Sequence, residues 1–403
     1  MARIEDYIPI VGAPVIDDLR LLADRLKGKV VQNINSTSVG GGVAEILNRM
    51  IPLLNALGVD ARWDLIKGGE EFFTVTKKFH NMLHGTYEEM SGIDFAAFME
   101  TSEQNIRQVN TYGDIVFVHD PQPIALIRKK AGNKWVWRCH VDVSDPYKSV
   151  WNFLKDFIAD YDAAVFSAPL FSQELPIKQF LISPSIDPLS DKNKELPPET
   201  VNAVLDKYGI RRDRPVITQI SRFDRLKDPL GVIEAYAQVK RSHDCQLVLA
   251  GGMAADDPEG VEVLSEVRER AARDKDIHIL LLPQDDIEIN ALQSGSTIII
   301  QKSLKEGFGL TVAEALWKAK PVVASNVGGI PLQVKHNYTG LLCHSIRSAA
   351  ASLKELLDNP AYARELGANG KEHVRENFLI TRHLKDYMLL FLSLYHEEDV
   401  VYL

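Results

Sequence analysis

The sequence predicts an α/β protein made of two successive domains, each built on a parallel β-sheet. Strand and helix patterns alternate along the chain, and most polar clusters follow directly after a strand. A proline-rich polar stretch at 183–200 interrupts this alternation, which then restarts. Of the 403 residues, 45% are hydrophobic and 25% are charged, a composition typical of globular proteins. The length suggests two domains.

Composition narrows the class of protein further. The net charge of -9 argues against a nucleic-acid-binding surface. Cys139, Cys245 and Cys343 are far apart and lie in or beside apolar runs, so we expect buried thiols rather than disulfides or a zinc site. There is neither an apolar stretch of membrane-spanning length nor the profile of a signal peptide, which predicts a cytoplasmic protein.

The first domain begins with an amphipathic helical pattern in residues 1–28. Short apolar runs predict strands at 29–34, 62–66, 114–118, 136–139, 163–167 and 180–182. Helical spacing of apolar residues predicts helices at 43–57, 70–83, 95–109 and 151–158. In the second domain the same criteria predict strands at 216–220, 246–250, 277–282, 297–300 and 321–324. They also predict helices at 230–239 and 261–272, and closing helices from residue 348 onward.

Three glycines, Gly40, Gly41 and Gly42, separate the first strand from its helix. This arrangement suits a phosphate-binding nest, and a plain tight turn explains it about as well. The spacing fits neither the dinucleotide fingerprint nor a P-loop, which argues against an NAD-dependent oxidoreductase.

The stretch 305–314 carries the strongest chemical signal. Gly307 and Gly309 flank Phe308 just before a predicted helix, so backbone amides there are able to face a phosphate or a sugar. Glu306 and Glu314 add two carboxylates that accept hydrogen bonds from vicinal hydroxyls. The alternative is a simple capping box formed by Thr311 and Glu314.

Two further clusters follow strands. Arg222 and Lys227 lie in the segment 221–229, and their two cationic groups together are suited to bind a diphosphate. A basic turn exposed to solvent explains the segment equally well. We expect Arg225 to be solvated. His119 and His140, each at the end of a strand, are candidate ligand contacts or histidines that anchor their own loops.

Two acidic pairs have the spacing of metal-dependent transferases. They are Asp160 with Asp162 and Asp274 with Asp276. Both precede strands and therefore belong to the edge of the sheet away from the ligand side, so we interpret them as surface turns.

Glu306, the glycine–aromatic–glycine segment 307–309 and Glu314 are spaced as in a known signature. They resemble the signature of the retaining glycosyltransferase family that includes sucrose synthase and glycogen synthase. The resemblance spans nearly the whole chain and implies a GT-B fold, in which two Rossmann-like domains face each other across a cleft. It implies an acceptor-binding domain at 1–183, joined by a returning C-terminal helix at 386–403. The nucleotide-sugar-binding domain would cover 184–385.

The resemblance also implies roles for the site residues. Catalytic roles fall to Glu306, Arg222, Lys227 and His119. The donor nucleotide and sugar would be held by Gly41, Gly42, Ser221, Gly307, Phe308, Gly309, Leu310, Thr311 and Glu314. The segment 138–142 is similar to a narrower branch of trehalose-forming glycosyltransferases and trehalose phosphorylases, in which Asp120, Arg138, His140 and Asp142 would line the acceptor pocket.

The implied reaction is glucosyl transfer from a nucleoside-diphosphate glucose, such as UDP-glucose or ADP-glucose, to glucose. The product would be trehalose, formed with retention by a front-face mechanism. The alternatives are a phosphate-dependent trehalose phosphorylase and a non-catalytic sugar-nucleotide sensor on the same fold. The expected partners are small sugars and nucleotide sugars, and we expect no binding to nucleic acid or to a membrane. Family precedent would make the protein a homodimer. No cofactor is required for the chemistry and no metal ligands are assigned; a role for Mg²⁺ is left open.

Overall fold

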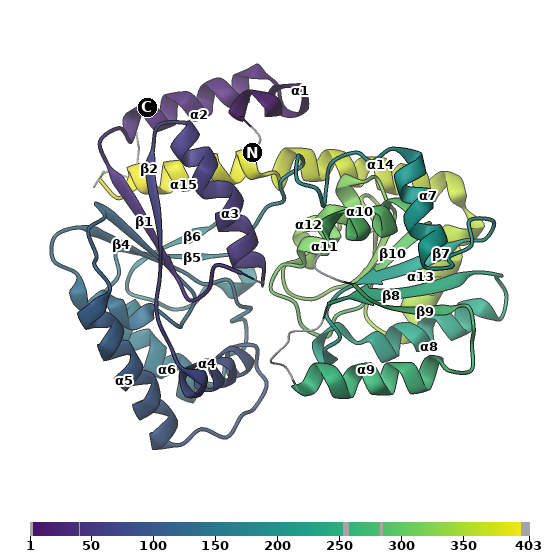
Figure 1. Cartoon of the computed structure of the whole chain (residues 1–403), viewed down its shortest axis with the longest axis horizontal. Helices are drawn as coiled ribbons and strands as arrows, with labels where there is room; N and C mark the ends of the chain where they lie inside the picture. The colour runs from purple at the N-terminus through teal and green to yellow at the C-terminus, as the bar shows by residue number, and fades with distance from the viewer. Residues whose placement is uncertain (1–2, 40, 253–257, 283–284, 396–403) are drawn as a thin grey trace. The chain divides into compact units, whose positions relative to one another are not determined.

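The computed structural model describes residues 3–39, 41–252, 258–282 and 285–395, and it divides the chain into two compact units. Unit 1 comprises Met1–Ser185 and Ile380–Leu403, and unit 2 comprises Ile186–Leu379. Within the described residues each unit contains one six-stranded sheet whose strands all pair in parallel (Figure 1). The predicted class, an α/β fold of two domains, is confirmed.

Unit 1 has the strand order β2-β1-β3-β4-β5-β6. Its strands are β1 (Val30–Asn35), β2 (Asp60–Leu65), β3 (Ile115–His119), β4 (Lys134–Arg138), β5 (Ala163–Phe166) and β6 (Lys178–Leu181). Its helices are α1 (Ile8–Val11), α2 (Ala13–Arg25), α3 (Gly41–Ala56), α4 (Glu70–Leu83), α5 (Gly92–Gln108), α6 (Lys148–Ile158) and α15 (Ile380–Ser393). Three short 3₁₀ turns, Ile4–Tyr7, Ile124–Lys129 and Pro169–Phe171, complete the unit.

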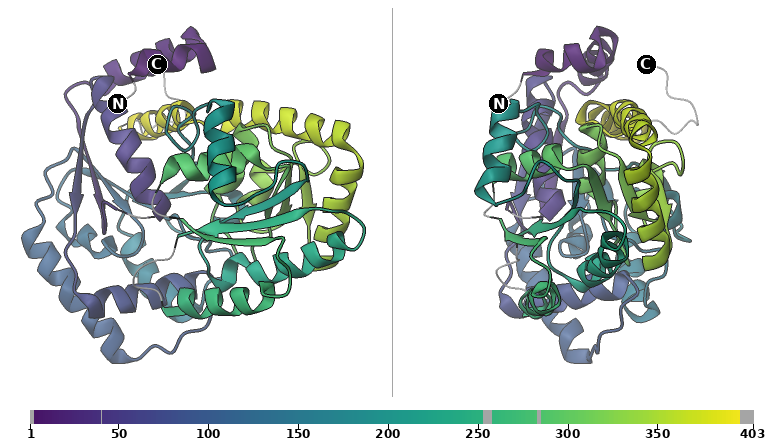
Figure 2. Two further views of the ribbon diagram at one scale, coloured as in Figure 1. Left: turned by 45° about the vertical axis from the view of Figure 1, so that its right-hand side comes forward. Right: turned by 90° about the vertical axis from the view of Figure 1, so that its right-hand side faces the viewer.

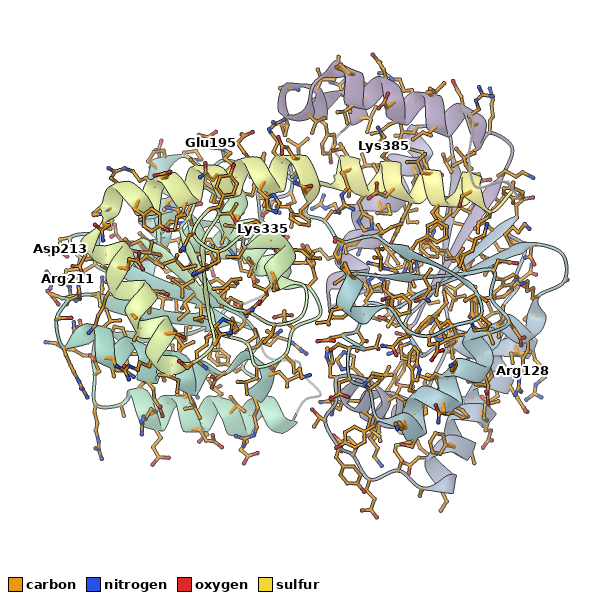
Figure 3. All side chains as sticks on the ribbon, turned by 180° about the vertical axis from the view of Figure 1, so that it is seen from behind. Arg128, Glu195, Arg211, Asp213, Lys335 and Lys385 are labelled. Carbon is orange, nitrogen blue, oxygen red and sulfur yellow. The ribbon has the colours of Figure 1, made fainter. Side chains whose placement is uncertain are left out.

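The helix α15 packs against α2 and α3 within unit 1 (Figure 3). Lys385 of α15 donates to Asp18 of α2 at 2.6 Å, and Arg382 donates to the carbonyls of Ser183 and Pro184. These contacts bind the last described helix to the same unit as the first. The returning helix was predicted at 386–403, whereas α15 begins six residues earlier, at Ile380. Residues 396–403 lie outside the described residues.

Unit 2 has the strand order β12-β11-β10-β7-β8-β9. Its strands are β7 (Val216–Ile220), β8 (Gln246–Gly251), β9 (Ile277–Leu281), β10 (Ile298–Gln301), β11 (Val322–Ser325) and β12 (Leu341–Cys343). Its helices are α7 (Pro198–Lys207), α8 (Pro229–Lys240), α9 (Pro258–Ala271), α10 (Asp286–Gly295), α11 (Leu310–Trp317), α12 (Ile330–Gln333), α13 (Ile346–Asp358) and α14 (Pro360–Asn377). A 3₁₀ turn, Arg225–Lys227, follows β7.

Both faces of the unit 2 sheet are covered by helices (Figure 2). On one face Ile217, Leu247 and Leu249 pack with α8, α9 and α13. On the other face Val216 and Val248 pack with α7 and α10. Neighbouring residues of one strand point to opposite faces, which is why these strands, covered on both faces, are mostly apolar. None of the described helices combines the length and the apolarity needed to cross a membrane.

Candidate functional site

In unit 2 the chain changes direction across the sheet between β7 and β10. From β7 it proceeds to β8 and β9 on one side, and β10 then returns to the other side of β7. The loops after β7 and β10 therefore leave adjacent strands in opposite directions, and open α/β sheets bind their ligands at the carboxyl ends of two such strands. The two strongest motifs of the sequence, 221–229 and 305–314, lie in these two loops and extend into the first residues of α8 and α11.

The loop after β7 is held by its own hydrogen bonds. Asp224 accepts from the Lys227 amide at 3.1 Å and begins the 3₁₀ turn, and Gln219 donates to the Lys227 carbonyl at 2.8 Å. Asp228 adopts a left-handed backbone, with φ of 48°, and caps α8 through a bond from the Gly231 amide. This turn directs the Lys227 side chain toward the loop after β10.

The two loops meet in a pair of ionic contacts. Lys227 Nζ lies 2.7 Å from Glu306 Oε2, and these side chains are only 17% and 11% exposed. The hydroxyl of Ser303 donates to the same carboxylate oxygen at 3.1 Å. Lys302 forms a second ion pair with Asp228. Predicted site residues from two loops are thus in direct contact, and Ser303 and Lys302 are partners that sequence reasoning missed.

Close backbone packing fixes the position of Glu306. A Cβ atom added to Gly328 would lie 1.6 Å from the Glu306 carbonyl oxygen, and one added to Gly329 would lie 2.8 Å from the Gly307 carbonyl oxygen. Gly328 also has a positive φ of 54°. Glycine is therefore required here for the loop after β11 to approach the Glu306 loop.

The helix α11 begins at Leu310 without a side-chain cap. Gly309 is its N-cap in a left-handed conformation, so the capping box that Thr311 and Glu314 offered as an alternative does not form. Phe308 is buried against Phe378, with ring centroids 5.5 Å apart. The aromatic residue of the motif therefore anchors the loop, and its flanking glycines shape the backbone.

Glu314 is buried one turn further along α11. Its carboxylate lies 3.5 Å from Gln293 Nε2 and 3.9 Å from Lys192 Nζ. Burial lowers the pKa of the neighbouring Lys318 to about 8, although the Glu314 charge acts in the opposite direction. Gln293 and Lys192 were not predicted, because they lie in segments without any motif.

The remaining cations of the β7 loop differ in environment. The Arg222 side chain is 59% exposed and lies 3.1 Å from Asp224. Arg225 pairs with Glu262 and Glu266. Ser221 follows β7, where its carbonyl packs so closely on Gly251 that a Cβ there would meet it at 1.8 Å.

Unit 1 has an equivalent change of direction between β1 and β3. From β1 the chain proceeds to β2, and β3 lies on the other side of β1. The predicted glycine-rich loop follows β1 and opens α3, which begins at Gly41 and includes Gly42. Gly40 lies outside the described residues. His119 ends β3, so both of these predicted features lie at the carboxyl ends of the two strands that flank the change of direction.

His119 stands in the middle of a chain of hydrogen bonds. Its Nε2 lies 3.1 Å from Asn33 Oδ1, and its Nδ1 lies 3.1 Å from His140 Nε2. Burial, aided by the Arg138 charge, lowers the pKa of His119 to about 3. The same causes, with smaller effects from His119 and His383, lower the pKa of His140 well below its usual range. Both rings are therefore neutral near pH 7, and Asn33 is a partner that sequence reasoning missed.

Asp120 follows His119 with a left-handed backbone, φ 64°. Its carboxylate accepts from the His140 amide at 2.8 Å, and its carbonyl accepts from Trp137 Nε1 at 3.0 Å. Burial raises the pKa of Asp120 to about 6, against the opposing effects of that amide and of Arg138. Asp120 therefore ties the loop after β3 to the loop after β4.

Arg138 and Asp142 are both buried. Arg138 Nη2 donates to Ser167 at 3.1 Å, whereas its Nε and Nη1 make no hydrogen bond within the described residues. Asp142 accepts from the amide and the hydroxyl of Ser144, at 2.9 and 2.6 Å. Their predicted contact with an acceptor stays a prediction.

The acidic pairs lie before β5 and β9. Asp162 accepts from the Trp135 amide and pairs with Lys130. Asp276 pairs with Arg214 and Lys240. In the part of the chain that the structure describes, no group of three His, Cys, Asp or Glu residues is arranged to hold a metal ion.

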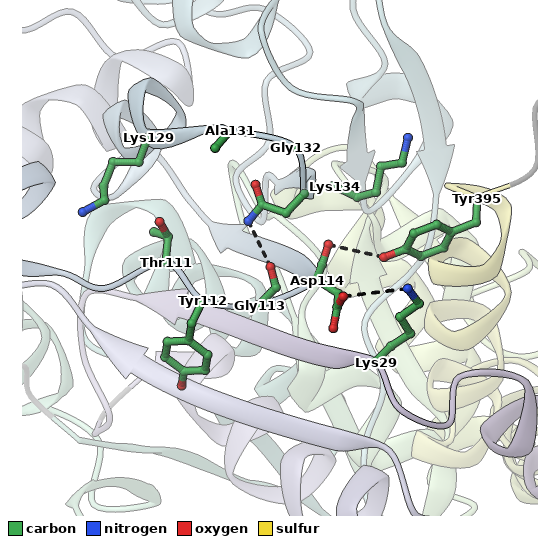
Figure 4. Close-up of a pocket in the computed structure, with 11 residues that line it drawn as sticks. Lys29, Thr111, Tyr112, Gly113, Asp114, Lys129, Ala131, Gly132, Lys134 and Tyr395 are labelled. Atoms are coloured by element: carbon green, nitrogen blue, oxygen red, sulfur yellow. Dashed lines mark hydrogen bonds and ion pairs between the residues drawn. The ribbon is translucent and has the colours of Figure 1, made fainter.

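A pocket of about 520 Å³ opens elsewhere in unit 1 (Figure 4). Lys29, Asp114 and Lys134 line it at the amino ends of β1, β3 and β4, together with Tyr395. Lys29 lies 3.8 Å from Asp114, and Tyr395 donates to the Asp114 carbonyl. The pocket is therefore at the edge of the sheet opposite to His119 and Asp120.

Comparison with known proteins connects both units to carbohydrate chemistry. Residues 33–173 match the family described as trehalose synthase, N-terminal domain, and residues 202–373 match glycosyl transferases group 1. The chain is 45% identical over 403 residues to a trehalose synthase of Rubrobacter xylanophilus, and 42% identical over 398 residues to one of Thermococcus litoralis. Each alignment covers 96% of both proteins.

Other known proteins resemble this chain at lower sequence identity. A trehalose phosphorylase of Pleurotus pulmonarius is 28% identical over 93% of this chain and 58% of its own length. Among solved structures, sucrose-phosphate synthase from Thermosynechococcus elongatus has a TM-score of 0.72 at 18% identity, covering 91% of this chain and 99% of that one. An alpha,alpha-trehalose-phosphate synthase (UDP-forming) from Burkholderia vietnamiensis has a TM-score of 0.71 at 14% identity, covering 93% and 99%.

The solved structures are of the GT-B class and establish the fold, and the relatives above 40% identity establish the family. The chain is a glycosyltransferase and belongs to the trehalose synthase family of group 1 glycosyltransferases.

Proposed function

We propose that this protein transfers glucose from a nucleoside-diphosphate glucose to free glucose and forms trehalose with retention of anomeric configuration. Unit 2 would bind the nucleotide sugar and unit 1 the acceptor. The proposal is supported by similarity over nearly the whole chain to proteins named trehalose synthase. It is also supported by the position of the polar clusters, which follow the strands where open α/β sheets bind ligands.

The Lys227–Glu306 contact is the observation that carries the proposal. A donor of this kind presents a neutral sugar with several hydroxyls next to a diphosphate. A carboxylate and an ammonium group 2.7 Å apart offer an acceptor for the hydroxyls and a cation for the diphosphate at one place. Arg222, largely exposed on the same loop, would add a planar cation.

The start of α11 would complete the donor site. Amides of residues 307–310 precede or open this helix, where the backbone dipole favours negative charge. Glu314 would accept hydrogen bonds from the two ribose hydroxyls, and its carboxylate lies beside Gln293 and Lys192. This ribose contact distinguishes a nucleotide sugar from a sugar phosphate.

For the chemical step we propose front-face displacement. The bond between the anomeric carbon and the diphosphate oxygen breaks, and its electron pair stays on that oxygen. A hydroxyl of the acceptor glucose attacks the anomeric carbon from the same face and passes its proton to the departing diphosphate. Lys227 and Arg222 would stabilise the charge that grows on the leaving group, so the protein acts by positioning and electrostatics. No carboxylate nucleophile is invoked.

Trehalose phosphorylase is the second candidate, because the phosphorylase of Pleurotus pulmonarius is 28% identical over 93% of this chain. It would use inorganic phosphate where the synthase uses a nucleoside diphosphate, and it would have no need of Glu314. A catalytically idle sensor of nucleotide sugars is the third.

One experiment separates these functions. Purified protein is incubated with trehalose and either UDP, ADP, GDP or inorganic phosphate, and the release of glucose is measured. We expect release with at least one nucleoside diphosphate and none with phosphate. Release with phosphate alone would establish the phosphorylase. Absence of release in every mixture, together with measurable nucleotide binding, would establish the sensor.

A further inference from the structure

The orientation of the Asn33 side chain is fixed by a backbone contact across β1 and β2. Its Nδ2 donates to the Arg62 carbonyl at 3.3 Å, and its Oδ1 faces His119 Nε2 at 3.1 Å. The reverse orientation would place two oxygen acceptors against each other at Arg62. Because an amide oxygen only accepts hydrogen bonds, His119 must carry its proton on Nε2.

This proton determines the state of the next ring. Neutral His119 has a lone pair on Nδ1, which lies 3.1 Å from His140 Nε2, so His140 must donate from Nε2. The charged and titratable groups around the two rings are Arg138, Asp120 and His383. Arg138 opposes a second positive charge on either ring, and Asp120 is occupied by the His140 amide.

The chain of hydrogen bonds ends at His140 Nδ1. Once Nε2 carries the proton, Nδ1 of a neutral ring is a lone pair. Within the described residues this atom makes no hydrogen bond, and His140 is half-buried whereas His119 is fully buried. Unit 1 therefore presents His140 Nδ1 as a hydrogen-bond acceptor. Asn33, which lies 86 residues before His119 in the sequence, determines that this nitrogen accepts rather than donates.

We propose that Asn33 is a positioning residue that sets the tautomers of His119 and His140, so that His140 Nδ1 accepts a hydrogen bond from a hydroxyl of the acceptor sugar. The sugar contact rests on the proposed function, whereas the tautomer chain does not. Replacing Asn33 by an apolar residue should reverse the donor and acceptor roles in the hydrogen bond between His119 and His140. The buried Nε2–H of His119 would lose its acceptor, and the proton is better placed on Nδ1, where it bonds to His140. His140 would then carry its own proton on Nδ1 and present a donor in place of an acceptor.

The direct test is the nitrogen chemical shifts of the histidine rings in ¹⁵N-labelled protein at pH 7.5, assigned from the signals lost in His119→Gln and His140→Gln. We expect both rings to be Nε2–H tautomers in the unaltered protein, a measurement that depends on no variant and on no activity. In Asn33→Leu we expect both to change to Nδ1–H, and the KM for glucose to rise about 10-fold with an unchanged KM for the donor.

Asn133 provides a matched control in the same unit. Its amide makes the same two kinds of contact: Nδ2 donates to the Gly113 carbonyl at 2.9 Å, and Oδ1 accepts from the ring nitrogen of Trp135 at 2.8 Å. Gly113 lies beside the pocket in Figure 4, at the far edge of the sheet. Asn133→Leu should remove equivalent hydrogen bonds and leave the histidine tautomers and the KM for glucose unchanged.

Each result has a distinct meaning. An Nδ1–H tautomer on either ring of the unaltered protein would overturn the proposal. Two Nε2–H tautomers in a protein that makes no trehalose would overturn the sugar contact together with the proposed function, and would leave the tautomer chain standing. Equal effects of Asn33→Leu and Asn133→Leu on the KM for glucose would overturn the positioning role of Asn33.

Discussion

Replacing Gly328 by alanine should disable the Glu306 loop while leaving unit 2 folded. The added Cβ would lie 1.6 Å from the Glu306 carbonyl oxygen, whereas real Cβ atoms stay beyond 3.0 Å from such neighbours, so one segment must move by the difference of about 1.4 Å. A displacement of about 1 Å in a positioned group lowers catalysis roughly 100-fold, and we expect kcat/KM for trehalose formation to fall at least that far.

Gly209, which follows α7, is the matched control. It has a similar positive φ of 67°, and a Cβ there would meet nothing within 4 Å. Gly209→Ala should therefore show only the strain of a left-handed alanine, about 1–2 kcal/mol in urea unfolding, with full activity. Gly328→Ala should add about 1–3 kcal/mol for overpacking. Equal activity of the two variants would contradict the role assigned to Gly328.

Three further experiments concern the Lys227–Glu306 ion pair, the Glu314 carboxylate and the His383 ring. Lys227→Met leaves the buried Glu306 carboxylate with Ser303 as its remaining side-chain partner among the described residues. A double-mutant cycle with Glu306→Gln should give a coupling of about 1–3 kcal/mol in urea unfolding; additive effects would deny the ion pair a role in stability. Glu314→Gln should weaken binding of the nucleoside diphosphate by about 10- to 100-fold in calorimetry, because a hydrogen bond to a charged group is lost; unchanged affinity would exclude the ribose contact. Burial holds the pKa of His383 well below its usual range, so this ring binds a proton only on unfolding, and its contribution to stability is present above pH 6.5 and lost as the pH falls. His383→Asn should therefore reduce the acid dependence of unfolding by up to about 1.4 kcal/mol per pH unit below pH 6.5, and an unchanged slope would contradict this assignment.

The sequence predicted the strands well where apolar runs were long and bounded by polar residues. β7 was predicted at Val216–Ile220, as observed, and the other central strands differ by one or two residues. β12, at Leu341–Cys343, was missed because three residues carry no periodicity. α7 was partly assigned to the linker, since its first residue, Pro198, stands in a proline-rich stretch, although proline is favourable at the start of a helix.

The candidate site was predictable only as far as motifs follow strands. Lys227 and Glu306 are 79 residues apart, and their contact depends on β7 and β10 being neighbours in the sheet. Nothing in the local sequence indicates that Gly328 packs on Glu306 or that Asn33 orients His119. Such partners are set by the order of strands in the sheet, which a single sequence does not contain.

The most direct test of the central claim is the NMR spectrum of the product formed from unlabelled glucose and a nucleoside-diphosphate glucose labelled with ¹³C at the anomeric carbon. We expect α,α-trehalose with the label in one ring only, in the α configuration, and one nucleoside diphosphate released per molecule. A labelled β-linked product, or free labelled glucose without trehalose, would contradict it.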